Sequence, residues 1–322
     1  MHTTLALAVL ALPAAALAQP AIYSNQSTDP NAVPLSTGAM SLSGVAAPAG
    51  GLWSELESDA SGANAVGGLA AHPTSGSAHF RLADDFTVAG VPWQVHALSL
   101  YAYPPGNGVS LEPFASVNLR VWSGPPGQAG STLVFGDTTT NRLTSAAATN
   151  LYRIFNSTAA PAPATPDSNK RIWQLNVATP GLVLSPGQYW LDWQIVPSSP
   201  SAEAFAPAVI TPAQRAPAGA NALQYSTAGW QPALDSGKPF IAADVNVEFP
   251  FVIRGYTGPG PCNGDFDGDG DTGTDADIEA FFRCLAGDCC PTCGSGDFDA
   301  DGDTGTDADI EAFFRVLAGN PC

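Results

Sequence analysis

The segment between Cys262 and Cys322 contains nearly the same sequence twice. The first copy, residues 265–287, reads DFDGDGDTGTDADIEAFFRCLAG, and the second, residues 297–319, reads DFDADGDTGTDADIEAFFRVLAG. The two copies start 32 residues apart and differ at two positions, where Gly268 and Cys284 of the first copy correspond to Ala300 and Val316 of the second. A duplication this close predicts one supersecondary unit that is used twice.

Each copy begins with aspartates at every second position. Gly270 and Gly302 occupy the sixth position, where a calcium-binding loop turns sharply and a side chain would obstruct the turn. Ca²⁺ takes six to eight oxygen ligands, and alternate side chains of a curled loop can converge on it. Without an ion, carboxylates this close together repel one another. The alternative is a solvated acidic tail that binds no ion.

After each loop the sequence predicts a helix with one apolar face, because apolar residues recur at i, i+3, i+4 and i+7. A threonine N-cap with an aspartate three residues later forms a pattern like a capping box, and a glycine follows the last apolar residue. One such helix is too short to be stable alone, so we expect the two to bury their phenylalanine faces against each other. The apolar residues are Ile278, Phe281, Phe282 and Leu285, then Ile310, Phe313, Phe314 and Leu317; the caps are Thr274 with Asp277, Thr306 with Asp309, Gly287 and Gly319.

This loop–helix duplication resembles a type I dockerin, over about the last fifth of the chain. The resemblance implies two Ca²⁺ ions and a cohesin-like protein partner. Counting from Asp265, the twelfth position is Ala276, and carboxylates fall at positions eleven and thirteen. We expect Asp277 and Asp309 to close the loops, because the apolar face then starts where dockerins start theirs, and Asp275 and Asp307 remain the alternative. The implied ligands are Asp265, Asp267, Asp269, Asp271 (through its carbonyl) and Asp277, with Asp297, Asp299, Asp301, Asp303 and Asp309 in the second loop.

The same resemblance implies partner contacts at Thr274, Arg283, Thr306 and Arg315. The variant spacing and the flanking cysteines are similar to the Gly-Cys-type dockerin tails of planctomycete secreted proteins, which puts a standard cohesin partner in doubt. Thrombospondin-like acidic repeats are the alternative family, but they lack the helix.

The first 18 residues, MHTTLALAVLALPAAALA, predict a signal peptide with an A-x-A cleavage site before Gln19. No other apolar run approaches the roughly 20 residues that span a bilayer. We therefore expect a secreted or cell-surface protein without a membrane span. A short buried helix is the alternative for these residues.

All six cysteines lie in the C-terminal part of the chain, and this density predicts disulfides rather than a zinc site, since no histidine lies near them. The symmetry of the repeat suggests the pairs Cys262–Cys290 and Cys293–Cys322, with Cys284–Cys289 across the helix end. A clasp joining Cys262 to Cys322 is the main alternative.

The negative charge is concentrated in the repeat. Residues 259–322 carry 15 acidic and 2 basic side chains, a net charge of −13 out of −18 for the whole chain. The 11 lysines and arginines argue against nucleic-acid binding, which needs clustered cations at the phosphates.

Residues 19–258 predict one all-β body, a β-sandwich that is jelly-roll-like, because apolar or alternating segments are separated by Gly/Pro turns. Residues 19–50 and 197–220 predict long loops, and residues 257–261 a short, stiff linker. The expected strand regions are 79–88, 93–103, 116–123, 131–136, 150–155, 171–177, 182–195 and 243–256.

The body carries no G-x-S-x-G or H-E-x-x-H motif. Candidate glycosidase pairs are Glu55 with Glu57 and Asp84 with Asp85, although surface acids are the expected role. Alternation on one predicted strand places Tyr189, Leu191, Trp193 and Ile195 on one face, expected to pack in the core rather than bind sugar, with Trp190, Asp192 and Gln194 on the other. The remaining candidates, His72, His79 and His96, are expected to be structural or exposed.

The segments LADDFTV and GQYWLDWQI resemble a recurring body of planctomycete secreted proteins for which we know no activity. We therefore expect a non-catalytic body that a dockerin-like tail attaches to a cohesin-like partner or the cell surface. The alternatives are a carbohydrate-binding module and a glycoside hydrolase or other polysaccharide-acting enzyme delivered by the same tail.

Overall fold

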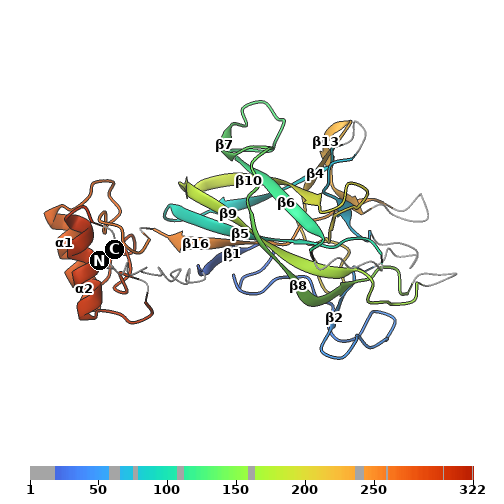
Figure 1. Ribbon diagram of the computed structural model, residues 1–322, viewed down its shortest axis with the longest axis horizontal. Coiled ribbons are helices and arrows are strands. Elements are labelled where there is room, and N and C mark those ends of the chain that lie inside the picture. The colour runs from blue at the N-terminus through green and yellow to red at the C-terminus, as the bar shows by residue number, and fades with distance from the viewer. Residues whose placement is uncertain are drawn as a thin grey trace, which may run out of the picture.

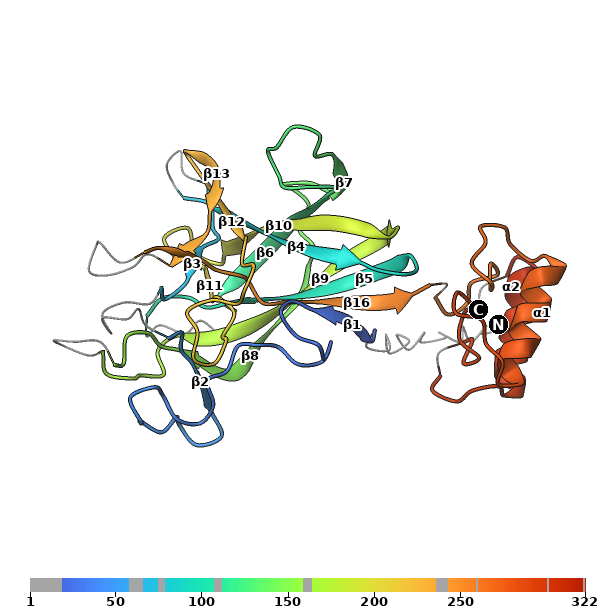
Figure 2. The same ribbon diagram turned by 180° about the vertical axis from the view of Figure 1, so that it is seen from behind.

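The computed structural model describes residues 19–57, 66–74, 79–106, 112–158, 164–235, 243–258, 260–299, 301–320 and 322. The predicted signal peptide, residues 1–18, lies outside these. The protein is mostly β, with two helices among the described residues. The helices lie together at one end of the molecule, beyond the end of β16 (Phe251–Thr257), and the strands form the rest (Figures 1 and 2).

Two six-stranded sheets contain most of the strands. The first has the order β1 (Ala21–Ser24), β16, β5 (Trp93–Ala102), β9 (Arg171–Leu184), β8 (Leu143–Arg153) and β2 (Leu52–Ser54). The second has the order β13 (Gly229–Pro232), β12 (Leu223–Ser226), β4 (Arg81–Val88), β10 (Gly187–Pro197), β6 (Phe114–Trp122) and β7 (Leu133–Gly136). Two short pairs complete the described strands: β11 (Phe205–Ala206) with β3 (Leu69–Ala70), and β14 (Leu234–Asp235) with β15 (Val245–Asn246).

The chain crosses between the two sheets repeatedly. β4, β6 and β10 belong to the second sheet, whereas β5, β9 and β16 belong to the first. Neighbouring strands are antiparallel except for β2 and β8, which are parallel. Such crossings bring the inner faces of both sheets onto one core.

The inner faces share a single hydrophobic cluster. Phe86 of β4 stacks on Trp93 of β5 with ring centroids 6.3 Å apart and meets Phe251 of β16 edge-on at 6.1 Å. These contacts join strands of different sheets, so the sheets pack face to face. On β10 the inner positions are Leu191, Trp193 and Ile195, as the alternation predicts.

The strand regions predicted from the alternation match β4, β5, β6 and β7 closely, whereas the region predicted over 171–177 is only the first half of β9, and the region predicted over 243–256 contains both β15 and most of β16. The region predicted as one strand over 182–195 is instead the end of β9 and most of β10, joined at the Ser185–Gly187 turn. β8 begins at Leu143, earlier than predicted, because its first half pairs with β9 although its side chains face solvent. The loops predicted at 19–50 and 197–220 are irregular apart from β1 and β11.

Each helix has the ends that its sequence predicts. α1 (Asp275–Leu285) and α2 (Asp307–Leu317) both begin with a complete capping box, formed by Thr274 with Asp277 and by Thr306 with Asp309. At the C-terminus of α1, Gly287 has a φ of +87° and donates to the carbonyl of Cys284, and Asp288 donates to Arg283. This is the Schellman arrangement, and α2 repeats it.

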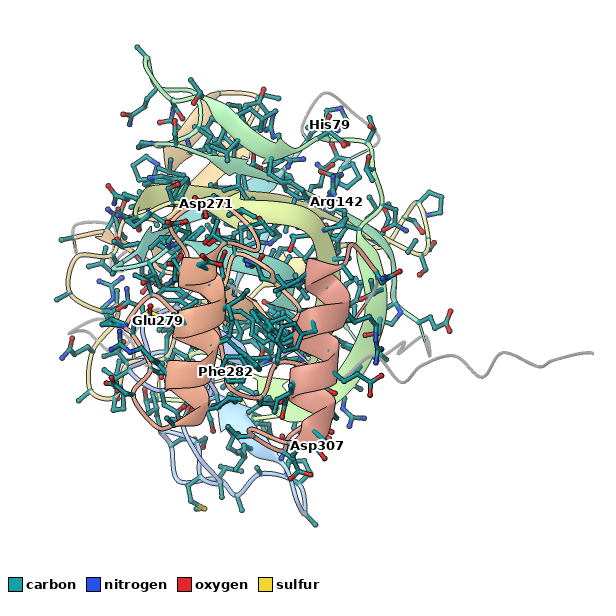
Figure 3. The ribbon with its side chains drawn as sticks, turned by 90° about the vertical axis from the view of Figure 1, so that its left-hand side faces the viewer. His79, Arg142, Asp271, Glu279, Phe282 and Asp307 are labelled. Carbon is teal, nitrogen blue, oxygen red and sulfur yellow. A yellow bond between two sulfur atoms is a disulfide. The ribbon has the colours of Figure 1, made fainter. Side chains whose placement is uncertain are left out.

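The helices lie side by side and run in opposite directions (Figure 3). Phe281 and Phe313 are fully buried between them, together with Phe266 and Phe298 from the two loops. The expectation that the helices bury phenylalanines against each other is confirmed for these residues. Among the described residues, no helix is long and apolar enough to cross a bilayer.

Candidate functional site

The two acidic loops are curled by their own carboxylates. In the first loop the Oδ1 atoms of Asp265, Asp267 and Asp269 accept hydrogen bonds from backbone N–H groups two or three residues further on, at 2.9–3.2 Å. In the second loop Asp299 and Asp301 accept equivalent bonds at 3.2 and 2.9 Å. This curling turns alternate side chains toward the inside of each loop.

The sharp turn of each loop falls at the predicted glycine. Gly270 and Gly302 both have a φ of +101°, in the region that residues with a Cβ rarely adopt. The two loops therefore have the same turn at the same position of the repeat.

The loops bring together part of the predicted ligand set. Oxygens of Asp265, Asp267 and Asp269 lie within 4.8 Å of one another in the first loop. The second loop gathers Asp297 and Asp299 with the helix residue Asp309. The first and third loop positions take part in both groups. The other predicted carboxylate ligands and the alternatives lie outside the two groups: Asp277, Asp301, Asp303, Asp275 and Asp307. Asp271, expected to bind through its carbonyl, adds no carboxylate to either group.

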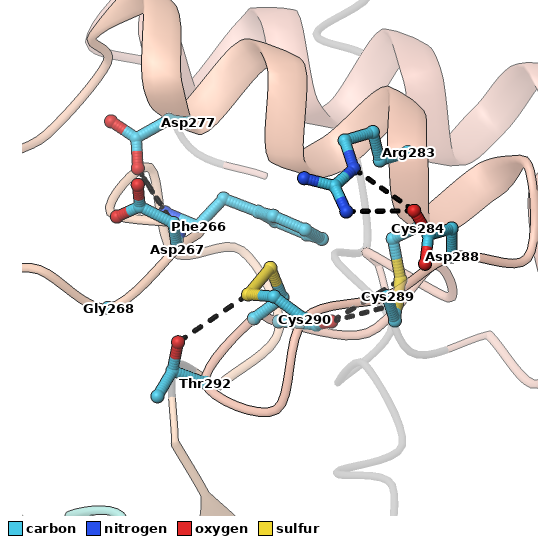
Figure 4. Close-up of a disulfide and its surroundings, with 12 residues drawn as sticks. Phe266, Asp267, Gly268, Asp277, Arg283, Cys284, Asp288, Cys289, Cys290 and Thr292 are labelled. Atoms are coloured by element: carbon cyan, nitrogen blue, oxygen red, sulfur yellow. Dashed lines mark hydrogen bonds and ion pairs between the residues drawn. A yellow bond between two sulfur atoms is a disulfide. The ribbon is translucent and has the colours of Figure 1, made fainter.

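In the first loop Asp277 lies outside the carboxylate group, and its oxygens hold the loop and the helix together. Its Oδ1 accepts from the backbone N–H of Phe266 at 2.6 Å (Figure 4). Its Oδ2 accepts from the N–H and the hydroxyl of Thr274 at 2.8 and 3.1 Å. Burial raises the pKa of Asp277, but these hydrogen bonds outweigh burial and hold it below the usual value. Asp309 makes the equivalent bonds to Phe298 and Thr306 while remaining within reach of its loop carboxylates.

The donor set and its electrostatics fit a hard divalent cation. Oδ1 of Asp297 is buried and has no hydrogen-bond partner, although it lies in the second carboxylate group. Desolvation, followed by repulsion from neighbouring aspartates, raises the pKa of Asp267, Asp271 and Asp299. A cation among these oxygens would remove the repulsion and give the Asp297 oxygen a partner.

The two loops are joined by a symmetric pair of hydrogen bonds. The N–H of Cys262 donates to the carbonyl of Phe298 at 2.8 Å, and the N–H of Gly294 donates to Phe266 at 2.8 Å. Cys262 and Gly294 stand at equivalent positions of the repeat, three residues before Asp265 and Asp297. Each loop is therefore braced by the segment that precedes the other, and neither copy is complete alone.

The six cysteines form Cys262–Cys322, Cys284–Cys289 and Cys290–Cys293 (Figure 4 shows the region around the last two). The Cys284–Cys289 pair is the predicted one. The predicted pairs Cys262–Cys290 and Cys293–Cys322 are wrong, because Cys290 and Cys293 face each other across a tight turn in which the N–H of Cys293 donates to Cys290. The alternative clasp from Cys262 to Cys322 is present and closes the repeat end to end.

The four side chains that the family resemblance implies for partner contact are occupied within the chain. Thr274 and Thr306 are half-buried capping residues, and their hydroxyls donate to Asp277 and Asp309. Arg283 pairs with Asp288 at 2.8 Å, and Arg315 pairs with Glu311 at 2.9 Å.

The sequence pattern misplaced one side chain of each helix. Phe282 and Phe314 belong to the predicted apolar faces, but they remain 44% and 45% exposed. Their ring centroids are 6.2 Å apart, so they form one apolar patch across the two helices. In Figure 3 the helices face the viewer, with Phe282 labelled between them and the sheets behind. We call Phe282 and Phe314 the phenylalanine patch.

The candidate glycosidase carboxylates of the body serve other purposes. Glu55 is buried and accepts from the backbone N–H groups of Leu42 and Ser157, so it ties two loops together, and Glu57 is half-buried. Asp84 is completely buried, and Asp85 is half-buried and accepts from Gln188. Neither predicted pair presents two carboxylates to an open cleft.

The histidines lie apart from these carboxylates. His72 is buried against Phe80 and Phe205 and hydrogen-bonds to Ala204, whereas His79 and His96 are exposed. On the outer side of β10, Asp192 is buried between Arg81 and Arg120, both at 2.6 Å, with Trp122 donating at 3.2 Å. The polar face of β10 is therefore organised by a buried ion network.

Comparisons with protein-family models, with curated proteins and with solved structures found no match.

Proposed function

We propose that the protein is a secreted, non-catalytic β-sandwich body that a C-terminal calcium-binding module of dockerin type attaches to a protein partner. The phenylalanine patch is the observation that carries the docking role. Both copies of the repeat leave the same large apolar side chain at the surface, where it contributes little to the core of the module. Exposed aromatic pairs of this kind are typical anchors of protein interfaces.

Calcium is the structural element of this proposal. Two ions would be held by the alternating aspartates of the loops, closed by Asp277 and Asp309, whose hydrogen bonds already link each loop to its helix. The ions would offset the repulsion among the carboxylates and fix the angle at which each helix leaves its loop. The orphaned oxygen of Asp297 supports this role.

The partner fits a cohesin-like protein that is apolar at its centre and basic at its rim. Residues 259–322 carry a net charge of −13, and Glu279 and Glu311 are exposed on the two helices. This acidic surround disfavours a second copy of the chain and favours a cationic rim. The jelly-roll-like assignment of the body is supported by two six-stranded sheets, antiparallel except at β2 and β8, that share one hydrophobic core.

The proposal is tested with the full chain in two steps. Calcium titration should reveal two sites and an increase in helical circular dichroism, and chelator should reverse it. Binding to a candidate cohesin is then measured for Phe282→Asp, Phe314→Asp and the double variant. Because Phe282 and Phe314 lie side by side in one patch, a partner docked in either orientation would cover both rings, so each single variant should weaken binding and the double variant should abolish it.

A matched control is Arg283→Glu with Arg315→Glu, which changes charge on the same helices and leaves the phenylalanines in place. Loss of binding in this control with retention in the double phenylalanine variant would contradict the patch as anchor. Unchanged helix content on calcium addition would contradict the calcium role.

A further inference from the structure

A third group of carboxylates lies in the body, far from the loops in sequence. Asp84 of β4 is 0% exposed, and Glu248, shortly before β16, is 2% exposed. Oxygens of Asp84, Glu248 and the neighbouring Asp85 lie within 4.8 Å of one another. Two carboxylates cannot both be ionised at this separation in a buried site without a large energetic cost.

One amide side chain spans the two buried carboxyls. Nδ2 of Asn25 lies 3.0 Å from Oδ2 of Asp84 and 3.2 Å from Oε2 of Glu248. The backbone N–H of Phe249 donates to Asp84 at 2.6 Å, and that of Asn221 donates to Glu248 at 2.6 Å. All of these donors are neutral, so they orient the carboxyls without supplying a positive charge.

The charged and titratable groups around the pair add no cation. Tyr23 of β1 faces it, and burial followed by the charges of Asp84, Asp85 and Glu248 raises the pKa of its phenol, so it stays neutral. Asp85 adds a third carboxyl. Among the described residues, no ion pair joins Asp84 or Glu248 to a lysine, arginine or histidine.

The carboxyl pair lies where the two sheets meet, so its protonation affects how the sheets are held together. Asp84 belongs to the second sheet, whereas Asn25 and Phe249 flank β1 and β16 of the first sheet. The hydrogen-bonded group therefore ties the two sheets and the start of the body together. We propose that the carboxyl of Asp84 keeps its proton at neutral pH and donates it in a hydrogen bond to Glu248, forming a proton-dependent clasp that loosens as the pH rises.

The direction of the pH dependence follows from the geometry. Burial first, and then the charge of Glu248 and a hydrogen bond between the two carboxyls, raise the pKa of Asp84 well above its usual value. A group whose pKa is raised on folding stabilises the protein fully below its unfolded pKa, about 3.9 for aspartate, and this contribution is lost as the pH rises through the folded pKa. The body should therefore lose stability between mildly acidic and alkaline pH.

Tryptophan fluorescence isolates the body in the intact chain, because all seven tryptophans precede residue 258. Thermal unfolding is followed in chelator from pH 5 to 9 for the wild type, Asp84→Asn, Glu248→Gln and the control Asp85→Asn. We expect the wild-type Tm to fall as the pH rises across this range. The fall should be about 3–5 °C for each tenfold decrease in the acid dissociation constant of the pair that folding causes. Asp84→Asn should flatten this fall and become more stable than the wild type at alkaline pH, whereas Asp85→Asn should keep it.

Carboxyl ¹³C chemical shifts of the wild type provide a readout that does not depend on a variant folding. A protonated carboxyl at neutral pH that disappears in Asp84→Asn or Glu248→Gln supports the proposal. Two ionised carboxyls at neutral pH would overturn it, as would an equal flattening by Asp85→Asn. A rise in the tryptophan-detected Tm on adding CaCl₂, present in the wild type and absent from Asp84→Asn, would assign a cation in place of the proton and also overturn it.

Discussion

Phe281 and Phe313 stack face to face with ring centroids 4.1 Å apart, on the approximate two-fold axis that relates the two copies of the repeat. Phe266 and Phe298 meet these rings edge-on, at 5.2 Å in each copy. Four phenylalanines thus make up most of the core of a segment of about 60 residues. A core this small depends on each of its members and on the cross-links and ions around it.

The first prediction concerns this stack. Phe281→Ala or Phe313→Ala should destabilise the helical module by about 3–5 kcal/mol, because each removes a fully buried ring and leaves a cavity. Phe282→Ala is the matched control, since it deletes the same side chain one position later, where it is half exposed, and should cost about 1 kcal/mol or less. Helical circular dichroism against urea, in saturating calcium, measures the difference. Equal costs at the two positions would contradict the assigned core.

The second prediction concerns the disulfides. Cys262 and Cys322 are separated by 60 residues, whereas Cys290 and Cys293 are separated by 3. A disulfide restricts the unfolded chain, and this restriction adds to the free energy of unfolding. The contribution should be about 4 kcal/mol for Cys262–Cys322 and about 1.6 kcal/mol for Cys290–Cys293. Replacing both cysteines of each pair by serine should reveal this order in the unfolding of the module, and a larger cost for the short pair would contradict it.

Most of the local structure could be predicted from the sequence, because it depends on neighbours along the chain. The capping boxes, the glycine turns and the strand alternation of β4 and β10 are of this kind. The distant pairings could not be settled from the sequence, which offered the Cys262–Cys322 clasp only as the alternative to the pairs that the repeat symmetry suggests. Cys262 meets Cys322, and β2 lies parallel to β8, only because the whole fold brings them together. The helical spacing of apolar residues also assigned both Phe281 and Phe282 to one apolar face. It could not show that Phe281 packs inward whereas Phe282 remains exposed.

Asp84 illustrates a signal that was present but incomplete. It occupies an inner position between Leu82 and Phe86 of an alternating strand. A carboxyl buried at such a position needs a hydrogen-bonding or charged partner. The partners, Glu248 and Asn25, come from the far end and the beginning of the body, so no pattern within one segment identifies them. The same limit applies to Asp192, whose neighbours come from β4 and β6.

The third prediction separates the two candidates that close each calcium loop. Asp275→Ala with Asp307→Ala should leave calcium affinity nearly unchanged, because both side chains are exposed, whereas Asp277 and Asp309 are buried and hydrogen-bonded to their loops. Asp277→Ala with Asp309→Ala should lower the affinity by about tenfold or more, equivalent to about 1.4 kcal/mol per site. Isothermal titration of the full chain measures both. Thr274→Ala with Thr306→Ala is the control for lost capping alone, at about 1 kcal/mol of helix stability each. The reverse order of the two aspartate variants would assign the loop closure to Asp275 and Asp307.

The last prediction concerns the buried ion network of the body. Asp192 accepts from Arg81 and Arg120 while fully buried, and it is the only carboxylate that the described ion pairs give to either arginine. Burial lowers the pKa of Arg81, and the charge of Asp192 acts against this. Asp192→Asn keeps the shape but removes the counter-charge, so it should destabilise the body by about 3–5 kcal/mol. Tryptophan fluorescence against urea, in chelator, measures this cost without interference from the calcium loops. Asp167→Asn, an exposed aspartate in a turn, is the control and should change stability by about 0.5 kcal/mol or less. A cost at Asp192 no larger than that of the control would mean that the two arginines find other partners when the carboxylate is lost.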